Sequence, residues 1–373
     1  MILNYNDALH CAKILENYFD NFDKIDEYMR NQKKIQIDEM PNTLFGMSFE
    51  DDLFQDFSMN PNEMDFEIVE MSGSRWNDYV KIISSHSVSV SIPGRNAQFT
   101  VIEKNTNKMV GFIRLGSPLI NCKPRNDMLG SVFTQSKEAS KAFNNTTIMG
   151  FTIVPAQPFG YNYLGGKLLT GICTSHEMRE ILNKKYNMNL CLFETTSLYG
   201  SSKTVSQYDG MKPYIRFKGL TDSKFVPTLD GDTYKTLKDF IEEKTGEQLI
   251  DPTDSSKKLK ATTKSISIIK KSLKDHPVEL KKFEESMEKA KDLTEQKRYY
   301  ISNYGFKNFV DVVTGKTDVL IKDEENYDKF YLENVVNWWK KKAQSRFESL
   351  QSENRLRDEL EVWTSGKEIQ IIR

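Results

Sequence analysis

Apolar and polar positions follow two different periods along this chain. In the first thirty residues the apolar positions recur at intervals of three and four, which predicts an amphipathic helix. These positions are Ala8, Ala12, Leu15, Phe19 and Phe22. From about residue 86 the chain changes to short runs of β-branched and aromatic residues, which are typical of strands. The pattern therefore predicts a helical start followed by a mixed α/β centre.

Five runs in the centre have the composition of strands. The first two, residues 99–103 and 109–115, are joined by the polar sequence KNTNK, which indicates a hairpin. The third, NTTIMGFTIVP, ends at Pro155, because proline has no N–H group with which to continue a ladder. The fourth, NLCLFETTS, contains a continuous apolar run that favours a strand buried on both faces, and KPYIRFKGLT is the fifth.

Helical patterns follow the third strand and dominate the last third of the chain. GGKLLTGICTSHEMREILNKKY has helical spacing with one apolar face. DTYKTLKDFIEEKTG ends at Gly246, a common helix stop, and residues 256–298 and 326–363 are also helical in pattern. We therefore expect an α+β fold in which a mixed β-sheet core carries helical extensions at both ends.

Charge composition divides the chain into three segments, an acidic helical region at 1–85, an α/β domain at 86–250 and a basic, mainly helical region at 251–373. Residues 1–70 hold 16 Asp or Glu against 5 Lys or Arg, whereas residues 256–300 hold 13 Lys or Arg against 7 Asp or Glu. This asymmetry predicts an electrostatic partner, within the chain or in another protein, and solvated helix faces are the alternative. The formal net charge of −1 gives no overall basic field.

The cysteines, the histidines and the hydropathy bear on the class and location of the protein. The cysteines are scattered and form no C-x-x-C pair, so neither a zinc site nor a disulfide framework is predicted. No two histidines have the spacing of metal ligands, and we expect no metal. The start shows no signal peptide, and no apolar run approaches the roughly 20 residues that a membrane helix needs. We expect a cytoplasmic protein without membrane contact.

The loop after the third strand carries a first family resemblance. A strand ends in VP, a QxxG loop follows, and a helix begins with GGKLL. This order resembles the GCN5-related N-acetyltransferase fold, in which loop amides at a helix N-terminus hold the pyrophosphate of acetyl-coenzyme A. The matching positions are Val154, Pro155, Gln157, Gly160, Leu168 and Leu169. The resemblance implies an acetyltransferase-like sheet, and it implies that Gln157, Gly160, Gly165 and Gly166 bind an acyl-coenzyme A or another phosphate-bearing donor.

The same loop departs from the acetyltransferase pattern. Asn162 stands where the family has a second glycine or alanine, and its side chain would crowd a phosphate close to the backbone. The extra residues YNYL separate Gly160 from Gly165 and Gly166, and tyrosines stand where the family keeps small residues. The sequence therefore leaves open whether the loop binds a cofactor.

A second resemblance covers about residues 86–230. This stretch is similar to the domain of unknown activity in the first subunit of the Druantia anti-phage system and in related phage proteins. The shared pattern comprises Glu194, Thr195, Thr196, Gly200, Tyr208, Gly219 and Thr221. The resemblance implies a phage- or defence-related protein with an acetyltransferase-like fold, similar in outline to a phage protein that modifies adenine in DNA.

Glu194 and Tyr208 are the candidate catalytic residues. Glu194 directly follows the apolar run CLF, at the expected carboxyl end of a central strand, where functional groups of α/β sheets collect. A desolvated carboxylate can have a raised pKa and serve as a general base, and the alternative is a glutamate that only tethers the next loop. Tyr208, Tyr161 and Tyr199 offer rings for base stacking or hydroxyls for proton donation, or they pack as ordinary aromatics.

Cations in the centre and near the C-terminus are candidate nucleic-acid contacts. The central ones would suit a phosphate backbone if the sheet brings them to one rim. They are Arg95, Arg114, Lys203, Lys212 and Arg216. In NWWKKKAQSR, Lys340 and Lys341 follow Trp338 and Trp339, and basic helices with aromatics are typical of nucleic-acid or membrane surfaces. We expect one tryptophan to face the core, and a solvated face is the alternative for the lysines.

Three functional hypotheses follow from these residues. The first is a phage- or defence-related protein that acts on DNA or RNA, as a modifying transferase in which Glu194 is base or substrate anchor. The second is a non-catalytic subunit that binds nucleic acid or protein, and Asn162 with the bulky loop favours it. The third, a small-molecule acyltransferase, requires that the loop bind an acyl-coenzyme A.

Overall fold

The computed structural model divides the chain into two compact units, each made of two separate stretches. The helical unit comprises Met1–Gln36 and Ser223–Glu295, and the sheet unit comprises Ile37–Asp222 and Gln296–Arg373. Within these units the described residues are 1–20, 25–38, 49–85, 94–119, 121–130, 135–197, 206–221, 229, 231–251, 257–292 and 297–363.

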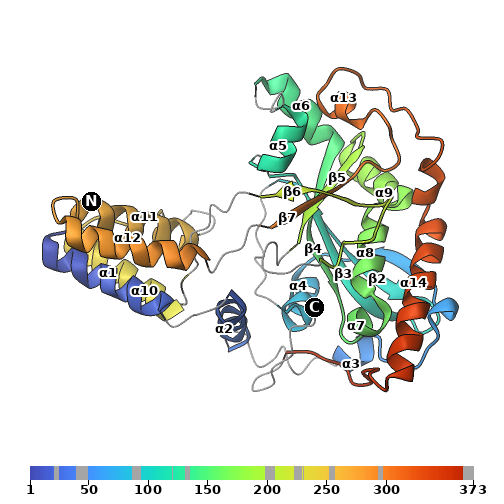
Figure 1. The fold of residues 1–373 in the computed structure, drawn as a ribbon, viewed down its shortest axis with the longest axis horizontal. Helices are drawn as coiled ribbons and strands as arrows, with labels where there is room; N and C mark the ends of the chain where they lie inside the picture. Colours follow the sequence, from blue (N-terminus) through green and yellow to red (C-terminus); the bar gives the residue numbers. More distant parts are fainter. Residues whose placement is uncertain are drawn as a thin grey trace. The chain divides into compact units, whose positions relative to one another are not determined.

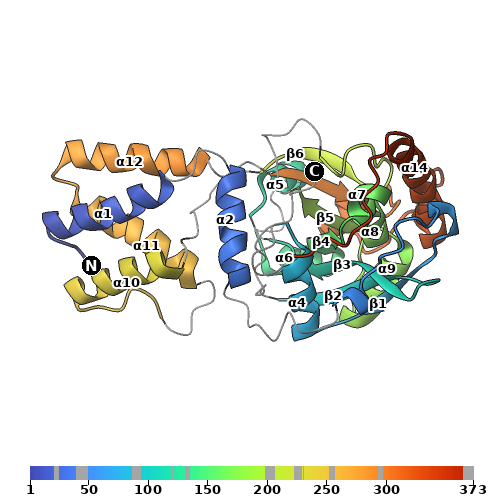
Figure 2. The same cartoon turned by 90° about the horizontal axis from the view of Figure 1, so that it is seen from below.

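The helical unit packs its helices around an apolar core of its own (Figures 1 and 2). Its helices are α1 (Tyr5–Phe19), α10 (Gly231–Thr245), α11 (Lys257–Ser272) and α12 (Pro277–Asp292), and α2 (Ile25–Asp38) crosses the boundary to the sheet unit. The predicted N-terminal helix is confirmed as α1. Ala8, Ala12, Leu15 and Phe19 are buried in this core, and Phe22 lies outside the described residues.

The boundaries of the two units differ from the segment boundaries predicted from charge composition. The predicted segments are consecutive, at 1–85, 86–250 and 251–373, whereas each unit joins an early stretch of chain to a late one. The backbone N–H of Leu3, for example, donates to Ser272 Oγ at 2.8 Å across 269 residues. Composition does not reveal such pairing, because it reports on neighbours in sequence and not in space.

The sheet unit is built on a seven-stranded mixed sheet. In spatial order the strands are β1 (Phe66–Glu70), β2 (Asn96–Glu103), β3 (Lys108–Gly116), β4 (Thr147–Pro155), β5 (Leu192–Thr196), β7 (Arg298–Ser302) and β6 (Arg216–Leu220). Neighbours are antiparallel, except that β4 and β5 run parallel. This parallel pairing ends at Gly150 opposite Thr195, and β4 continues to Pro155. The predicted α+β fold with a mixed sheet is confirmed.

The five predicted strands are all present, as β2 to β6. Pro155 is the last residue of β4, and residues 192–195 of β5 are buried, as expected of a strand covered on both faces. The pattern does not predict β1 or β7. FEIVE lies in an acidic stretch, and RYYIS pairs only with strands that are distant in the sequence.

Helices cover both faces of the sheet. Figure 2 shows α8 and α14 on one side of the strands and α4 and α6 on the other. The longer helices are α4 (Ser74–Ile83), α5 (Lys123–Leu129), α6 (Lys137–Thr146), α8 (Gly165–Cys173), α9 (His176–Tyr186) and α14 (Leu332–Ser352). The short ones are α3 (Phe49–Asp52), η2 (Pro61–Glu63), α7 (Phe159–Tyr163), α13 (Phe309–Val313) and η4 (Tyr327–Phe330).

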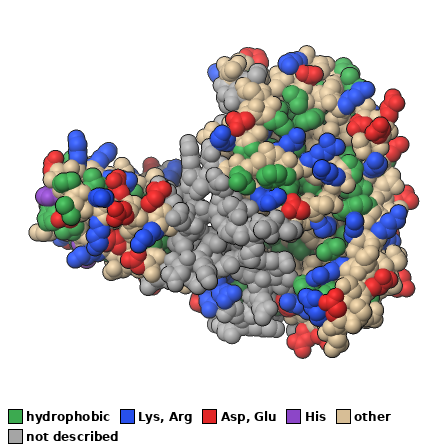
Figure 3. Space-filling model, viewed as in Figure 1, with side chains coloured by type: hydrophobic (Ala, Val, Ile, Leu, Met, Phe, Trp, Pro, Cys, Tyr) green, Lys and Arg blue, Asp and Glu red, His purple; other side chains and the backbone are tan. Residues whose placement is uncertain are grey.

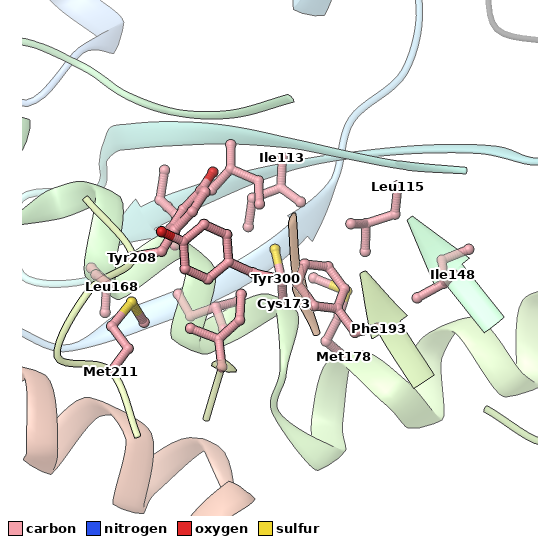
Figure 4. Close-up of a cluster of buried hydrophobic side chains, with 14 of the residues drawn as sticks. Ile113, Leu115, Ile148, Leu168, Cys173, Met178, Phe193, Tyr208, Met211 and Tyr300 are labelled. Atoms are coloured by element: carbon pink, nitrogen blue, oxygen red, sulfur yellow. The ribbon is translucent and has the colours of Figure 1, made fainter. Parts of the chain in front are cut away.

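The core beneath α8 is closely packed. Figure 4 shows side chains from β3, β4, β5 and β7 gathered against Leu168 and Cys173 of α8 and Met178 of α9. Gly111 of β3 allows this approach, because a Cβ atom there would lie 2.5 Å from Leu169 Cδ1. The core therefore fixes the start of α8 relative to the end of β4, which is the loop that resembles a cofactor site.

The helix predicted within residues 326–363 is present as α14 (Leu332–Ser352). As expected, one of its two tryptophans faces the core: Trp339 is fully buried, whereas Trp338 is only partly buried. Trp339 Nε1 donates to the backbone oxygens of Tyr163 at 2.8 Å and of Leu164 at 3.3 Å. The helix is thus anchored at the junction of α7 and α8.

His176, the first residue of α9, is enclosed by aromatic side chains. Its ring centroid lies 4.1 Å from that of Tyr327 and 4.9 Å from that of Tyr331, with Phe306 and Phe330 farther away. Nε2 is 2.9 Å from the Tyr327 carbonyl oxygen, and buried Nδ1 has no hydrogen-bond partner. Burial lowers the pKa of His176 below its ordinary value of 6.5, because the charged ring would lose its hydration.

We expect His176 to make the sheet unit sensitive to acid. Because its pKa is lowered in the folded state, the unfolded chain binds a proton first as the pH falls below about 6.5, and stability is lost there. His176→Gln, which keeps a donor for the carbonyl, should show a smaller drop in urea midpoint between pH 7.5 and 5.5. His10→Gln, at an exposed position of α1, is the control. Equal pH dependence of wild type and His176→Gln would contradict this assignment.

Candidate functional site

Glu194 lies at the centre of a buried polar cluster formed by strands β5 and β7 and helix α5. It is 1 % exposed, in β5, and its Oε1 is 2.8 Å from Nη1 of Arg125 on α5. The hydroxyl of Tyr299 on β7 donates to the other carboxylate oxygen, Oε2, at 2.7 Å. Arg125 and Tyr299 are both fully buried, and the guanidinium of Arg125 also lies 4.7 Å from the centre of the Phe143 ring.

The electrostatics of this cluster are those of a carboxylate removed from water. Burial raises the pKa of Glu194, while the charge of Arg125 and the two hydrogen bonds act in the opposite direction. Burial also raises the pKa of Tyr299 well above its ordinary value, and the neighbouring carboxylate raises it further. A carboxylate hydrogen-bonded to a tyrosine hydroxyl has the chemistry of a proton acceptor with a donor beside it.

Tyr208, the other predicted catalytic residue, does not join this cluster. It is 4 % exposed and packs edge-on against Tyr300, with ring centroids 5.2 Å apart (Figure 4). Its hydroxyl lies near the side chains of Gln207 and of Thr195, the residue after Glu194. Successive residues of a strand point to opposite faces, so Tyr208 and Glu194 lie on opposite sides of β5. Tyr199 lies outside the described residues.

The sequence does not predict two members of the cluster, Arg125 and Tyr299. Arg125 is 69 residues and Tyr299 is 105 residues from Glu194, and neither stands in a motif. The available signal is weak: RYYIS combines aromatic and β-branched residues, which is typical of a strand. Nothing in that signal indicates which tyrosine faces the glutamate.

The glycine loop leads into α8, but protein groups fill the first turn of that helix. A Cβ on Gly166 would lie 2.7 Å from Oε1 of Gln207, and the Lys167 ammonium donates to the backbone oxygens of Gln207 at 3.0 Å and Asp209 at 2.5 Å. A Cβ on Gly165 would lie 2.7 Å from the Phe159 ring. Both glycines are therefore needed for packing within the protein.

The remaining loop residues also serve internal contacts. A Cβ on Gly160 would lie 2.4 Å from Nε2 of Gln157. Asn162 is buried, and its side chain pairs with the backbone of Arg357, donating to the carbonyl oxygen at 2.7 Å and accepting from the N–H at 3.2 Å. These residues do not fit a pyrophosphate at the start of α8. The cofactor role of Gln157, Gly160, Gly165 and Gly166 stays a prediction that this packing disfavours.

The cations predicted to bind nucleic acid occupy separate places. Arg114 is buried on β3, where its Nε donates to Asn96 Oδ1 at 2.9 Å. Arg95, just before β2, donates to the Asn144 carbonyl oxygen. Lys212 and Arg216 are exposed, the latter on edge strand β6, and Lys203 lies outside the described residues. The described part of the chain therefore does not bring these residues to one rim.

The two lysines predicted on the last helix differ in their surroundings. Lys340 is partly buried and its Nζ donates to the Asn62 carbonyl oxygen at 3.1 Å, whereas Lys341 is exposed. A nucleic-acid role for these two lysines stays a prediction.

Comparison with known protein families shows the family to which the chain belongs. The family described as Druantia protein DruA matches residues 18–210. The chain belongs to the DruA family. No curated protein and no solved structure matches it.

The DruA match includes only part of the cluster around Glu194. Glu194 and Arg125 lie within residues 18–210, together with the loop and α8. Tyr299 and α14 lie beyond the matched residues. In this DruA-family chain, the later stretch therefore completes the sheet and supplies the tyrosine of the cluster.

The described residues of this DruA-family chain contain no group of three or more His, Cys, Asp or Glu placed to hold a metal ion. Cys11, Cys122, Cys173 and Cys191 are buried free thiols. Among the described helices, none has both the length and the apolar character that crossing a membrane requires.

Proposed function

We propose that this DruA-family chain is a defence-related protein that acts on nucleic acid, as a modifying transferase with Glu194 at its chemical centre. Family membership supports the relation to phage defence. The order of the strands, with one parallel pair in the middle of an otherwise antiparallel sheet, supports an acetyltransferase-like scaffold. Groups at the carboxyl ends of such strands are well placed for binding and chemistry.

The observation that carries the proposal is the buried set of Arg125, Glu194 and Tyr299. Burying an ion pair costs desolvation free energy that its attraction often fails to offset, so the arrangement adds little to stability over apolar residues. Titratable groups with such perturbed surroundings concentrate at functional sites. Glu194 also lies one residue before the point where β4 and β5 stop pairing, since it pairs with Met149 and the last parallel pair is Gly150 with Thr195.

The second candidate is a non-catalytic subunit that binds nucleic acid or protein. Two observations favour it: both oxygens of Glu194 are engaged by protein groups, and Gln207 covers the first turn of α8. The third candidate, a small-molecule acyltransferase, has the least support, because it needs that same turn for the pyrophosphate of an acyl-coenzyme A.

The test is mass spectrometry of nucleosides from the DNA and RNA of cells that produce the protein. We expect a new nucleoside mass with the wild type and its loss with Glu194→Gln, since the amide keeps the shape but is not a proton acceptor of comparable strength. Glu103→Gln is the matched control. Glu103 is also a fully buried glutamate, but it accepts backbone N–H groups of a turn, including that of Thr106 at 2.8 Å.

The outcomes separate the two leading candidates. A new nucleoside that persists at full yield with folded Glu194→Gln would remove Glu194 from the chemistry. If the wild type produces no new nucleoside, the binding-subunit function is favoured. Loss of the nucleoside with Glu103→Gln as well would point to a general effect on folding.

A further inference from the structure

Tyr161 of α7 is surrounded by arginines that come from α14 and the chain after it. The guanidinium carbon of Arg346 lies 4.8 Å and that of Arg357 lies 4.3 Å from the centre of the Tyr161 ring. Arg355 donates to the Tyr161 hydroxyl at 3.2 Å, and Arg346 Nε donates to its carbonyl oxygen at 3.3 Å. One tyrosine thus orders three guanidinium groups.

Helix α14 also carries Lys342 and Arg346 on the side next to its buried residues. Trp339, Ala343 and Phe347 form its buried stripe. Lys342 and Arg346 are one helical turn apart beside this stripe, and Lys342 is exposed. Figure 3 shows several blue side chains on the face of the molecule that includes α14.

Lys167, at the start of α8, extends this group of cations. Burial lowers the pKa of Lys167, the carboxylate of Asp209 acts against this, and the charge of Lys342 lowers it further. Helices α8 and α14 pack against each other, which places Lys167 and Lys342 on adjoining parts of the surface. Like charges kept together in this way are stabilised by a bound anion.

The carboxylates nearby balance only part of this charge. Arg355 pairs with Glu353 at 2.5 Å and Arg357 with Glu361 at 2.8 Å. For Lys342 and Arg346, no carboxylate oxygen of the described residues lies within 4.0 Å of a side-chain nitrogen. Among the described residues, Lys342 and Arg346 therefore form no direct ion pair, although the charge of Arg346 acts on the Glu353 carboxylate from farther away.

We propose that the Tyr161 surface, defined as Tyr161, Lys167, Lys342, Arg346, Arg355 and Arg357, binds the phosphodiester backbone of nucleic acid. The inference rests on the proposed function, since it names the surface through which the protein holds its nucleic-acid target. Arginine forks match phosphate geometry, and guanidiniums that are already ordered lose less conformational freedom on binding. Phosphate contacts position a nucleic acid without reading its sequence, so binding through this surface is sequence-independent.

The experiment is fluorescence anisotropy with labelled duplex DNA, single-stranded DNA and RNA of one sequence, titrated with the full chain at several salt concentrations. The test variant is Lys342→Gln with Arg346→Gln. We expect its affinity to fall by about tenfold or more, and the slope of log K against log salt to decrease by about 1.4–1.8, since each of the two lost phosphate contacts removes about 0.7–0.9. Comparison of the three probes identifies the preferred form of nucleic acid.

The matched control removes two charges elsewhere in the sheet unit, as Lys316→Gln with Lys329→Gln. Both lysines are exposed, and their side chains contact Asp311 and Asn326. This control should bind as the wild type does. A test variant that keeps the wild-type affinity and salt slope, or a control that weakens binding equally, would overturn the Tyr161 surface.

Failure of this inference is distinguishable from failure of the proposed function. Anisotropy measures binding alone and does not require that Glu194 perform any chemistry. If Glu194→Gln abolishes the new nucleoside while the Lys342 and Arg346 variant binds normally, the chemical proposal stands and the surface is wrong. If no nucleoside forms but the variant loses affinity, the surface stands in a binding subunit.

Discussion

Arg125→Leu is expected to destabilise the sheet unit by about 3–5 kcal/mol, because it leaves the carboxylate of Glu194 buried without its cation. Arg125 is fully buried and its Nη1 is 2.8 Å from Glu194 Oε1. Of the two described partners of the carboxylate, the Tyr299 hydroxyl then remains, with its hydrogen bond of 2.7 Å. The loss is measured as the shift in free energy of unfolding by urea.

Tryptophan fluorescence reports this unfolding specifically. Trp76, Trp338, Trp339 and Trp363 are the 4 tryptophans of the chain, and all belong to the sheet unit. Unfolding of the helical unit therefore adds little to the signal, and a two-state analysis applies to one unit at a time.

A double variant and a surface control sharpen the Arg125 prediction. Adding Glu194→Gln to Arg125→Leu removes the stranded charge and should restore about half of the lost stability, while the amide oxygen still accepts from Tyr299. Lys123→Gln, in an exposed pair with Asp127 on the same helix, should cost less than about 1 kcal/mol. A single-variant loss no larger than that of Lys123→Gln would show that the buried pair is not ionised as its geometry indicates.

Trp339→Ala is expected to destabilise the sheet unit by about 3–5 kcal/mol, the usual range for deleting a buried tryptophan. The indole packs against Phe66 and Phe159, with ring centroids 5.1 and 6.2 Å away. Its Nε1 also satisfies the backbone oxygens of Tyr163 and Leu164 at the sharp turn between α7 and α8. Urea unfolding followed by the remaining tryptophans measures the effect.

Two variants separate the packing and hydrogen-bond contributions of Trp339. Trp339→Phe keeps much of the apolar contact but loses the donor, so it should cost about 1–3 kcal/mol. Trp338→Ala, at the adjacent and only partly buried position, should cost less than Trp339→Ala. Equal losses at positions 338 and 339 would contradict the assignment of Trp339 as the anchor of α14.

The Trp339 anchor also supports the Tyr161 surface. Arg346 lies on α14, two turns after Trp339, and its contact with Tyr161 depends on how α14 sits against α7. Trp339→Phe should therefore weaken nucleic-acid binding less than Lys342→Gln with Arg346→Gln, provided the variant remains folded. This comparison distinguishes a positioning residue from residues that contact phosphate.

Local sequence patterns are sufficient to predict most individual strands and helices of this protein. The spacing of Ala8, Ala12 and Leu15 predicts α1, and the runs around KNTNK and up to Pro155 predict β2, β3 and β4. These predictions hold because periodicity and turn chemistry act between neighbours within a few residues. That Glu194 lies on a buried strand was predictable for the same reason, but it occupies the middle of β5 (Leu192–Thr196) and not the expected carboxyl end.

The contacts between residues that are distant in the sequence follow from the fold. The fold placed Arg125 and Tyr299 on Glu194, put Tyr208 on the opposite face of β5, and set Gln207 against Gly166 at the start of α8. It also joined Tyr161 to arginines almost two hundred residues later, such as Arg355 at a separation of 194. Such contacts depend on how the sheet and its helices pack, and no local pattern in the chain specifies that packing.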